Sequence, residues 1–365
     1  LFKFAVENNS ASIVGSALRK ILDKEILHER WNEEVTNVAK KLNLYLAELD
    51  LVAGELRRNQ IQLVALKNSG IARGIYPDLA GCPMGDIDAL VKESDFIATH
   101  KVMVSLGFKT LGANSRGREK LSKLGCSDNT GDLDNELREG LRSGGMEYLK
   151  PLNDGITLWF EVQWRSIAGR WIESHKEPAA VDLINQSMAI KGTDARILSP
   201  IDNLLQVCLH TAKHTYVRSP GFRLHTDVDR IVRRTTINWE EFEKRVIHMG
   251  VKTAVYISLK IPCSLLRTPI PREILVNLRP PEWKEKIILK WIQKVGLFNP
   301  SKKKWSKLGY FIFNLLLYDN SSQLYRAVIP DSRIMYSQYN IRSRWALPWY
   351  YVKRIWKLVF RRLNT

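Results

Sequence analysis

The segment Asp86-Ile-Asp-Ala-Leu-Val91 places two acidic residues, two positions apart, in an otherwise apolar run. Such a run predicts a strand, and residues i and i+2 of a strand point to the same side. The carboxylates of Asp86 and Asp88 would therefore share one face, where like charges repel each other. A divalent cation removes that cost, because hard oxygen ligands suit Mg²⁺. The segment thus predicts a metal site at a strand.

A third acidic residue, Glu161, lies in the apolar segment Trp159-Phe-Glu-Val-Gln163. A buried, unpaired carboxylate is costly, and a metal shared with the two aspartates would explain its position. Two plainer explanations stand beside this one. Asp86 and Asp88 could be a turn and a helix cap, and Glu161 could pair with Arg165 or with a lysine.

Strand and helix patterns surround these acids, within a chain of 365 residues that is long enough for two or three packed units. In the first half they predict helix over 1–60, a strand over 61–66, a turn over 67–70, a short helix over 71–76, a loop over 78–85, and a helix capped by Ser94 that closes at Gly107. Residues 111–145 are rich in Gly, Ser, Asn and charge and predict a long excursion. Strands over 146–152 and 156–164 would form a hairpin around Asn153-Asp-Gly155.

The second half of the chain is helical in pattern, with helices expected near 200–217, 221–234, 239–250 and 251–266 and from Pro348 onward. His210 and His214 share a helical face at the spacing of a metal pair. We interpret them as structural histidines or nucleotide contacts, because no third ligand accompanies them.

Charge and cysteine content narrow the classes of partner and compartment. The net charge is +18, and residues 301–365 contain 13 Lys or Arg against Asp319 and Asp331. This excess favours a phosphate-rich partner such as a nucleotide, nucleic acid or anionic membrane, although a solvated basic face is the plainer explanation.

The four cysteines form no CxxC pair, which argues against a disulfide framework or zinc knuckle and suits a reducing cytoplasm. No apolar run approaches the ~20 residues of a membrane-spanning helix.

The last segment mixes aromatic and basic residues, including Trp345, Trp349 and Trp356. As a helix it would align Tyr351, Ile355, Val359 and Leu363 along one face. Such a helix could pack across the helical domain, which we favour, or contact an anionic membrane or nucleic acid. The corresponding localisation is the cytoplasm, with peripheral contact at the inner face of the membrane as the alternative.

Taken in order, these motifs resemble the DNA polymerase β-like nucleotidyltransferase superfamily. More narrowly, the chain resembles a bacterial family of uncharacterised nucleotidyltransferases. The segments that carry the resemblance are Leu66-Lys67, Tyr76-Pro-Asp78, Asp86-Ile-Asp-Ala-Leu-Val91, Glu161-Val-Gln-Trp164, the run from Leu205 to His214, and Asp227-Val-Asp-Arg-Ile231. Asp-x-Asp alone is a weak signal, but the ordered set is specific.

The resemblance implies an α+β fold, in which a small mixed sheet with helices is followed by a mostly helical second half. It implies an enzyme that transfers an NMP from an NTP to a hydroxyl or phosphate acceptor, with release of pyrophosphate. The implied catalytic residues and metal ligands are Asp86, Asp88 and Glu161, which would hold two Mg²⁺ ions or, alternatively, Mn²⁺. The implied nucleotide-binding residues are Lys67, Ser69, Gly70 and Arg73. The implied organisation is a helical segment over 1–60, a catalytic core over 61–165, a helical domain over 166–340 and a basic aromatic helix over 341–365.

The chain departs from the family pattern at three positions. Asn68 stands where the family has Gly, Cys82 stands near a family Arg, and Gln163 replaces a strand His. Asn can adopt the left-handed backbone that Gly adopts, so we expect the turn at Asn68 to survive. Loss of the Arg and the His would alter phosphate contacts or weaken activity.

Two other functions fit parts of the sequence. A glycosyltransferase could use Asp-x-Asp to hold a nucleotide-sugar through a metal, although such enzymes usually place that motif after several βα units. A non-catalytic protein could hold a membrane or nucleic acid through its basic tail. The identity of the acceptor and of the preferred NTP is not encoded in these motifs.

Overall fold

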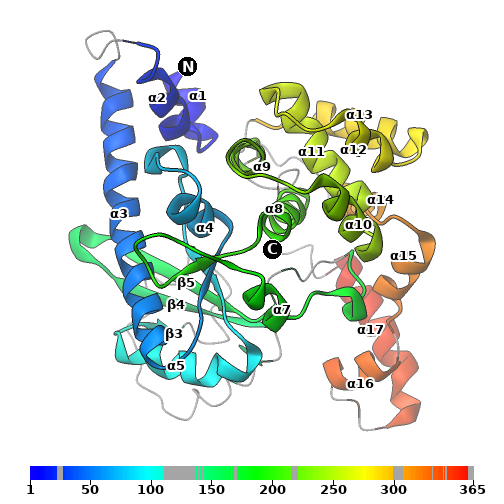
Figure 1. The fold of residues 1–365 in the computed structure, drawn as a ribbon. Coiled ribbons are helices and arrows are strands. Elements are labelled where there is room, and N and C mark those ends of the chain that lie inside the picture. Colours follow the sequence, from blue (N-terminus) through cyan, green and yellow to red (C-terminus); the bar gives the residue numbers. More distant parts are fainter. Residues whose placement is uncertain are drawn as a thin grey trace. The chain divides into compact units, whose positions relative to one another are not determined.

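The computed structural model describes residues 1–22, 28–110, 144–165, 171–214, 221–298, 307–330, 332–339 and 343–360, with residues 137, 140, 141, 167 and 341 between them. The chain divides into two compact units. The first contains Leu1–Ile167, Pro178–Val207 and Arg230–Ile237, and the second contains Ala168–Glu177, Cys208–Asp229 and Asn238–Thr365. The fold is α+β, as expected (Figure 1).

In the described part of the first unit, a seven-stranded mixed sheet has the order β3-β4-β5-β2-β1-β7-β6. The strands are β1 (Val64–Leu66), β2 (Ile87–Leu90), β3 (Lys109–Thr110), β4 (Gly145–Pro151), β5 (Thr157–Gln163), β6 (Met188–Ala189) and β7 (Arg196–Ile197). The pairs β2–β5 and β1–β7 are parallel and the others are antiparallel. The predicted strands and the hairpin around 153–155 are confirmed, whereas the two-residue strands β3, β6 and β7 were not anticipated.

The helices of the first unit are α1 (Phe2–Glu7), α2 (Ala11–Leu18), α3 (Glu29–Arg58), α4 (Lys67–Gly74), α5 (Phe96–Ser105) and α7 (Ala180–Asn185), with short 3-10 turns η1 (Leu79–Gly81), η2 (Glu93–Asp95) and η3 (Asn153–Gly155). Helix α3 buries a stripe at helical spacing that includes Leu42, Leu49 and Leu56. It packs against the hairpin, because the Tyr45 hydroxyl donates to the Thr157 carbonyl at 3.1 Å and Glu48 pairs with Lys150 at 2.8 Å.

Two local predictions in this unit are wrong. Helix α4 begins at Lys67, directly after β1, where we expected a turn before a helix at 71. The residue that makes the abrupt change of direction is Lys67 itself, whose φ is +50°. Ser94 does not cap α5, because its hydroxyl donates to the Asp95 carboxylate at 3.1 Å and the helix begins later, at Phe96. Gly107 closes α5 as expected, with φ +83°.

The remaining helices are α8 (Pro200–His214), α9 (Arg223–Arg234), α10 (Trp239–Met249), α11 (Lys252–Leu266), α12 (Arg272–Asn277), α13 (Glu282–Val295), α14 (Lys307–Leu316), α15 (Ser321–Val328), α16 (Ser332–Tyr339) and α17 (Leu347–Phe360), with 3-10 turns η4 (Ser174–Lys176) and η5 (Arg344–Ala346). The helices expected in this half are confirmed. The start of α10 shows why: the Asn238 side chain accepts a hydrogen bond from the Glu241 amide, as an N-cap residue does.

Some expectations lie outside the described residues, namely most of the excursion over 111–145, including Cys126, and the end of the helix expected to 217. None of the described cysteines, Cys82, Cys208 and Cys263, is in a disulfide. A search of the helices within the described ranges finds none both long and apolar enough to cross a membrane.

The close approach of α4 to β1 predicts the effect of a methyl group at Gly70. A Cβ there would lie 2.6 Å from the Ala65 carbonyl oxygen, a backbone atom that cannot move aside. We expect Gly70→Ala to lower the free energy of unfolding by about 1–3 kcal/mol, as overpacking does. Urea denaturation of the purified chain measures this.

The matched control is Gly54→Ala, in the interior of α3. A Cβ at Gly54 meets only Asp194 Oδ2, at an ordinary 3.7 Å. Alanine is the better helix former, so this variant should be more stable than the parent by up to about 1 kcal/mol. Equal stabilities for the two variants would contradict the packing argument.

Candidate active site

Three acidic residues form one row across neighbouring strands. Asp88 of β2 is in register with Glu161 of β5, and Glu161 is in register with Glu147 of β4. Residues directly opposite each other on paired strands share a face of the sheet, and like charges there destabilise it. The row therefore requires a compensating cation.

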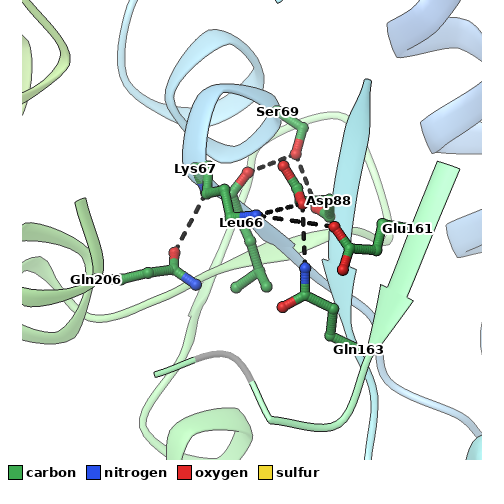
Figure 2. Close-up of polar contacts among 7 residues, drawn as sticks. All are labelled: Leu66, Lys67, Ser69, Asp88, Glu161, Gln163 and Gln206. Atoms are coloured by element: carbon green, nitrogen blue, oxygen red, sulfur yellow. Dashed lines mark hydrogen bonds and ion pairs between the residues drawn. The ribbon is translucent and has the colours of Figure 1, made fainter. Parts of the chain in front are cut away.

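The ammonium group of Lys67 supplies that cation. Its Nζ lies 2.5 Å from Asp88 Oδ1 and 3.9 Å from Glu161 Oε2. Figure 2 shows Lys67 reaching from the start of α4 toward both carboxylates. The side chain of Asp88 is only 8% exposed, whereas that of Glu161 is 34% exposed. Asp88 is thus the enclosed member of the pair and Glu161 the accessible one.

The backbone of Lys67 has an unusual conformation. Its φ of +50° is in the left-handed region, which is costly for a long side chain. Its amide donates to Gln206 Oε1 at 3.3 Å, across to α8. The expectation that Asn68 would take the left-handed position is wrong, since Lys67 occupies it and the Asn68 side chain donates to the Pro83 carbonyl at 3.1 Å. The strained residue is the one whose side chain meets the carboxylates.

The charges in this cluster shift one another's pKa values. Burial raises the pKa of Asp88 to about 7; the Lys67 ammonium opposes that rise, and the neighbouring Glu161 adds to it. Burial lowers the pKa of Lys67, but the charges of Asp88, Glu161 and Asp86 outweigh it and hold that pKa above its ordinary value. The ammonium stays charged, and Asp88 is the carboxylate whose ionisation most needs a cation.

Further hydrogen bonds fix Asp88 in place. Gln163 Nε2 donates to Asp88 Oδ1 at 3.1 Å, so Gln163, one of the departures from the family pattern, contacts this carboxylate. The Ser69 hydroxyl lies 2.6 Å from the Leu66 carbonyl and 2.8 Å from the Asp88 carbonyl (Figure 2). A hydroxyl has one proton, so it donates to one of these two carbonyls at a time. Because one carbonyl belongs to β1 and the other to β2, the buried Ser69 side chain links the two strands.

The remaining predicted nucleotide-binding residues are placed differently. Gly70 is buried against β1, as described above. Arg73 lies at the other end of α4, where its Nε donates to Asp50 at 3.0 Å and its guanidinium reaches the Gly192 carbonyl at 2.9 Å. The structure thus brings Lys67, Asp88 and Glu161 together and places Arg73 in a separate contact.

Asp86 precedes β2 at the end of the loop that returns from α4. It is half-buried, and its charge acts on Lys67. This loop is held by α9, because Arg230 donates to the Gly81 carbonyl and its guanidinium lies 5.2 Å from the centre of the Tyr76 ring. Two motifs of the family resemblance, around Tyr76 and around Arg230, therefore meet on the segment that leads to Asp86.

The carboxylates of this row offer oxygen ligands for a divalent cation. No group of three or more His, Cys, Asp or Glu side chains is assembled as a metal site within the described residues. The donor chemistry nevertheless fits, because carboxylate oxygens suit Mg²⁺. The positively charged Lys67 ammonium already lies against Asp88 and Glu161. The rings of His210 and His214 contact each other, with centres 4.7 Å apart and planes tilted by 50°.

Sequence reasoning missed Glu147 and Gln206. Glu147 could have been found from the hairpin, because counting back from a turn over 153–155 places it opposite Glu161. Gln206 comes from a helix distant in sequence and bonds to a backbone amide, and no local pattern signals such a contact.

Comparison with known proteins adds one match. A family model described as an uncharacterised nucleotidyltransferase matches residues 1–267. Searches of curated proteins and of solved structures found no match. The matched region contains the carboxylate row, Lys67, Gln163 and Gln206, and it ends before α12.

The raised pKa of Asp88 predicts a pH-dependent stability in buffer with a metal chelator. The unfolded chain releases this proton near pH ~3.9, whereas the folded chain holds it until about pH 7. The stabilisation from protonated Asp88 is therefore complete at low pH and is lost as the pH rises through the folded pKa. The parent's advantage over Asp88→Asn in free energy of unfolding should fall by about 1–3 kcal/mol from about pH 5 to pH 8.

Urea denaturation at several pH values measures this difference. The exposed Asp182→Asn is the matched control for loss of a carboxylate at the surface. A parent-to-variant difference that stays constant with pH for Asp88→Asn would show that the raised pKa is wrong.

Proposed function

The chain belongs to the uncharacterised nucleotidyltransferase family, and we propose that it transfers an NMP from an NTP to a hydroxyl or phosphate acceptor. The acceptor oxygen would form a bond to the α-phosphorus, and the bond to the leaving pyrophosphate would break. The observation that supports this most is that Asp88 and Glu161 lie side by side on adjacent parallel strands, with the Lys67 ammonium against both. Two carboxylates held side by side could hold the divalent cations that neutralise the negative charge of the transferring phosphate.

Asp86, Asp88 and Glu161 would hold the Mg²⁺ ions of this reaction. Bound Mg²⁺ would supply neutralisation of the phosphate charge and a lower pKa for the acceptor hydroxyl. Asp88 would be the fixed ligand, because Gln163 and the tie between β1 and β2 hold it in place. Asp86 and Glu161 are the more accessible carboxylates.

The chain's own groups would do the remaining work. Glu161, exposed enough to meet an acceptor, would take the proton from the acceptor hydroxyl. The Lys67 ammonium would neutralise phosphate oxygens as pyrophosphate leaves. Amides of the first turn of α4, at Ser69 and Gly70, would bind phosphate, as helix N-termini do. Arg73, paired with Asp50, has no part in this proposal.

The proposal predicts loss of turnover when the aspartates are neutralised. Asp86→Asn with Asp88→Asn should abolish transfer. The chain should stay folded, because asparagine has the size of aspartate and Glu161 remains near the Lys67 ammonium, 3.9 Å away in the parent. The assay incubates the chain with each α-labelled NTP, Mg²⁺ and a fractionated cell extract as the source of acceptor, and follows labelled product and pyrophosphate. Glu93→Gln, an exposed carboxylate beyond the other end of β2, is the matched control and should keep parent activity.

Three outcomes would overturn the proposal. The double variant could turn over NTP at the parent rate. The parent could release a nucleoside diphosphate from a nucleotide-sugar in place of pyrophosphate, which would indicate a glycosyltransferase. The parent could bind Mg²⁺ and NTP with no label transferred to any fraction, which would indicate a binding protein.

The position of Lys67 predicts that Mg²⁺ can replace its ammonium in stabilising the fold. Thermal melting measures this without any turnover. Lys67→Met leaves Asp88 buried without its ammonium, so the chain should lose about 3 kcal/mol of stability in metal-free buffer. Millimolar Mg²⁺ should restore more of the melting temperature in this variant than it adds to the parent, because binding to the native state stabilises it.

The matched control is Lys150→Met, which breaks a pair of similar burial. Lys150 and Glu48 lie 2.8 Å apart and are 20% and 17% exposed. This variant should also melt earlier, but Mg²⁺ should not restore it. Equal responses of the two variants to Mg²⁺ would show that no cation site lies at Asp88 and Glu161.

A further inference from the structure

Helix α17 exposes an apolar aromatic face. Trp349, Val352 and Trp356 are 66%, 56% and 62% exposed, and Trp345, just before the helix, is 92% exposed. Their spacing of three or four residues places them on one side of the helix. Large apolar side chains gathered in this way mark an interaction site more often than singly exposed ones do.

The opposite face of α17 is already packed. The Tyr351 hydroxyl donates to the Pro330 carbonyl at 2.6 Å. The Tyr350 ring lies 5.5 Å from that of Tyr339, on α16. These contacts orient the helix, so the exposure of the tryptophans follows from how α17 is anchored within its own unit.

The charge around this face has one sign. Residues 332–365 contain eight Lys or Arg and no Asp or Glu. Lys353 follows directly after Val352 and is exposed, and Arg344 lies beside Trp345. The exposed face therefore combines apolar tryptophans with a basic border. The segment also lies beyond residues 1–267, the part that the nucleotidyltransferase family model matches.

We infer that α17 binds the surface of an anionic lipid bilayer through Trp345, Trp349, Val352 and Trp356. Trp side chains prefer the interface between lipid and water, and basic residues near an anionic surface strengthen the attachment. The 14 residues of α17 extend about 21 Å at 1.5 Å per residue, shorter than the ~30 Å hydrocarbon core. The helix would lie in the interface plane, with its Tyr351 face toward the protein.

The composition of the face favours lipid over the other occupants. Single-stranded nucleic acid stacks its bases on aromatic rings, but Val352, which lies between Trp349 and Trp356 on the exposed face, offers no surface for stacking. A second copy of the chain would bring the same uniformly basic border against this one, and like charges there repel. An anionic membrane matches both the apolar centre and the basic border.

The experiment is co-sedimentation of the full chain with vesicles, without nucleotide or metal. One set of vesicles contains phosphatidylcholine alone and the other adds phosphatidylserine. The parent should bind the anionic set more strongly, and the binding should weaken as salt is raised from about 0.1 M to about 1 M, where the Debye length falls to about 3 Å. Trp349→Ser with Trp356→Ser should weaken binding to anionic vesicles about tenfold or more.

Trp283→Ser provides the matched control. Trp283 lies on α13 of the same unit and is 60% exposed, close to the two tested tryptophans. Because all three side chains are largely in solvent, none of these substitutions should unfold the chain, and equal melting temperatures check this. The Trp283 variant should bind vesicles as the parent does.

Four results would overturn the inference. The parent could bind neither set of vesicles, or the double variant could bind as strongly as the parent. The parent could sediment as a dimer that the double variant abolishes, without vesicle binding, which would assign the face to self-association. The double variant could instead lose affinity for a single-stranded oligonucleotide while vesicles bind neither form. None of these results bears on nucleotidyl transfer, which is assayed separately.

Discussion

The charge balance at Asp88 is the constraint on which the centre of the sheet depends. This carboxylate is buried in β2 and has Glu161 beside it on β5, so an ionised Asp88 needs a cation at that place. The chain supplies the cation from Lys67 at the end of β1. The left-handed backbone of Lys67 and the Gln206 contact then follow as the means of directing this side chain inward.

The parts of the fold that follow from local pattern could be predicted from the sequence. The Asp86 to Val91 strand, the hairpin over 153–155 and the amphipathic helices all show in spacings of two or of three and four residues. The prediction that Asp88 and Glu161 lie together did not follow from spacing alone. It was predicted because a carboxylate within an apolar strand is costly alone, and that physical reason holds whatever the cation is.

The parts that could not be predicted depend on contacts between distant segments. Residues 67–70 have turn-like composition, yet they form the first turn of α4 because Ser69 and Gly70 fit against β1 and β2. The family resemblance implied that Arg73 binds phosphate, but Asp50 of α3 pairs with it at the other end of the helix. Composition alone does not reveal which distant partner a polar side chain will meet.

The basic C-terminal segment is a further case in which composition did not settle the contacts of a side chain. Its composition left two alternatives, packing within the protein or contact with a charged partner. In the structure one face of the helix is packed, since the Tyr351 hydroxyl donates to the Pro330 carbonyl, and Trp349 and Trp356 on the other face are exposed. A helix with aromatic residues on both sides can pack one face within the protein and keep the other face exposed. The two alternatives therefore do not exclude each other. The anchoring of α17 through Tyr351 is therefore the condition for the lipid contact that we propose, since it leaves Trp349 and Trp356 on the exposed side.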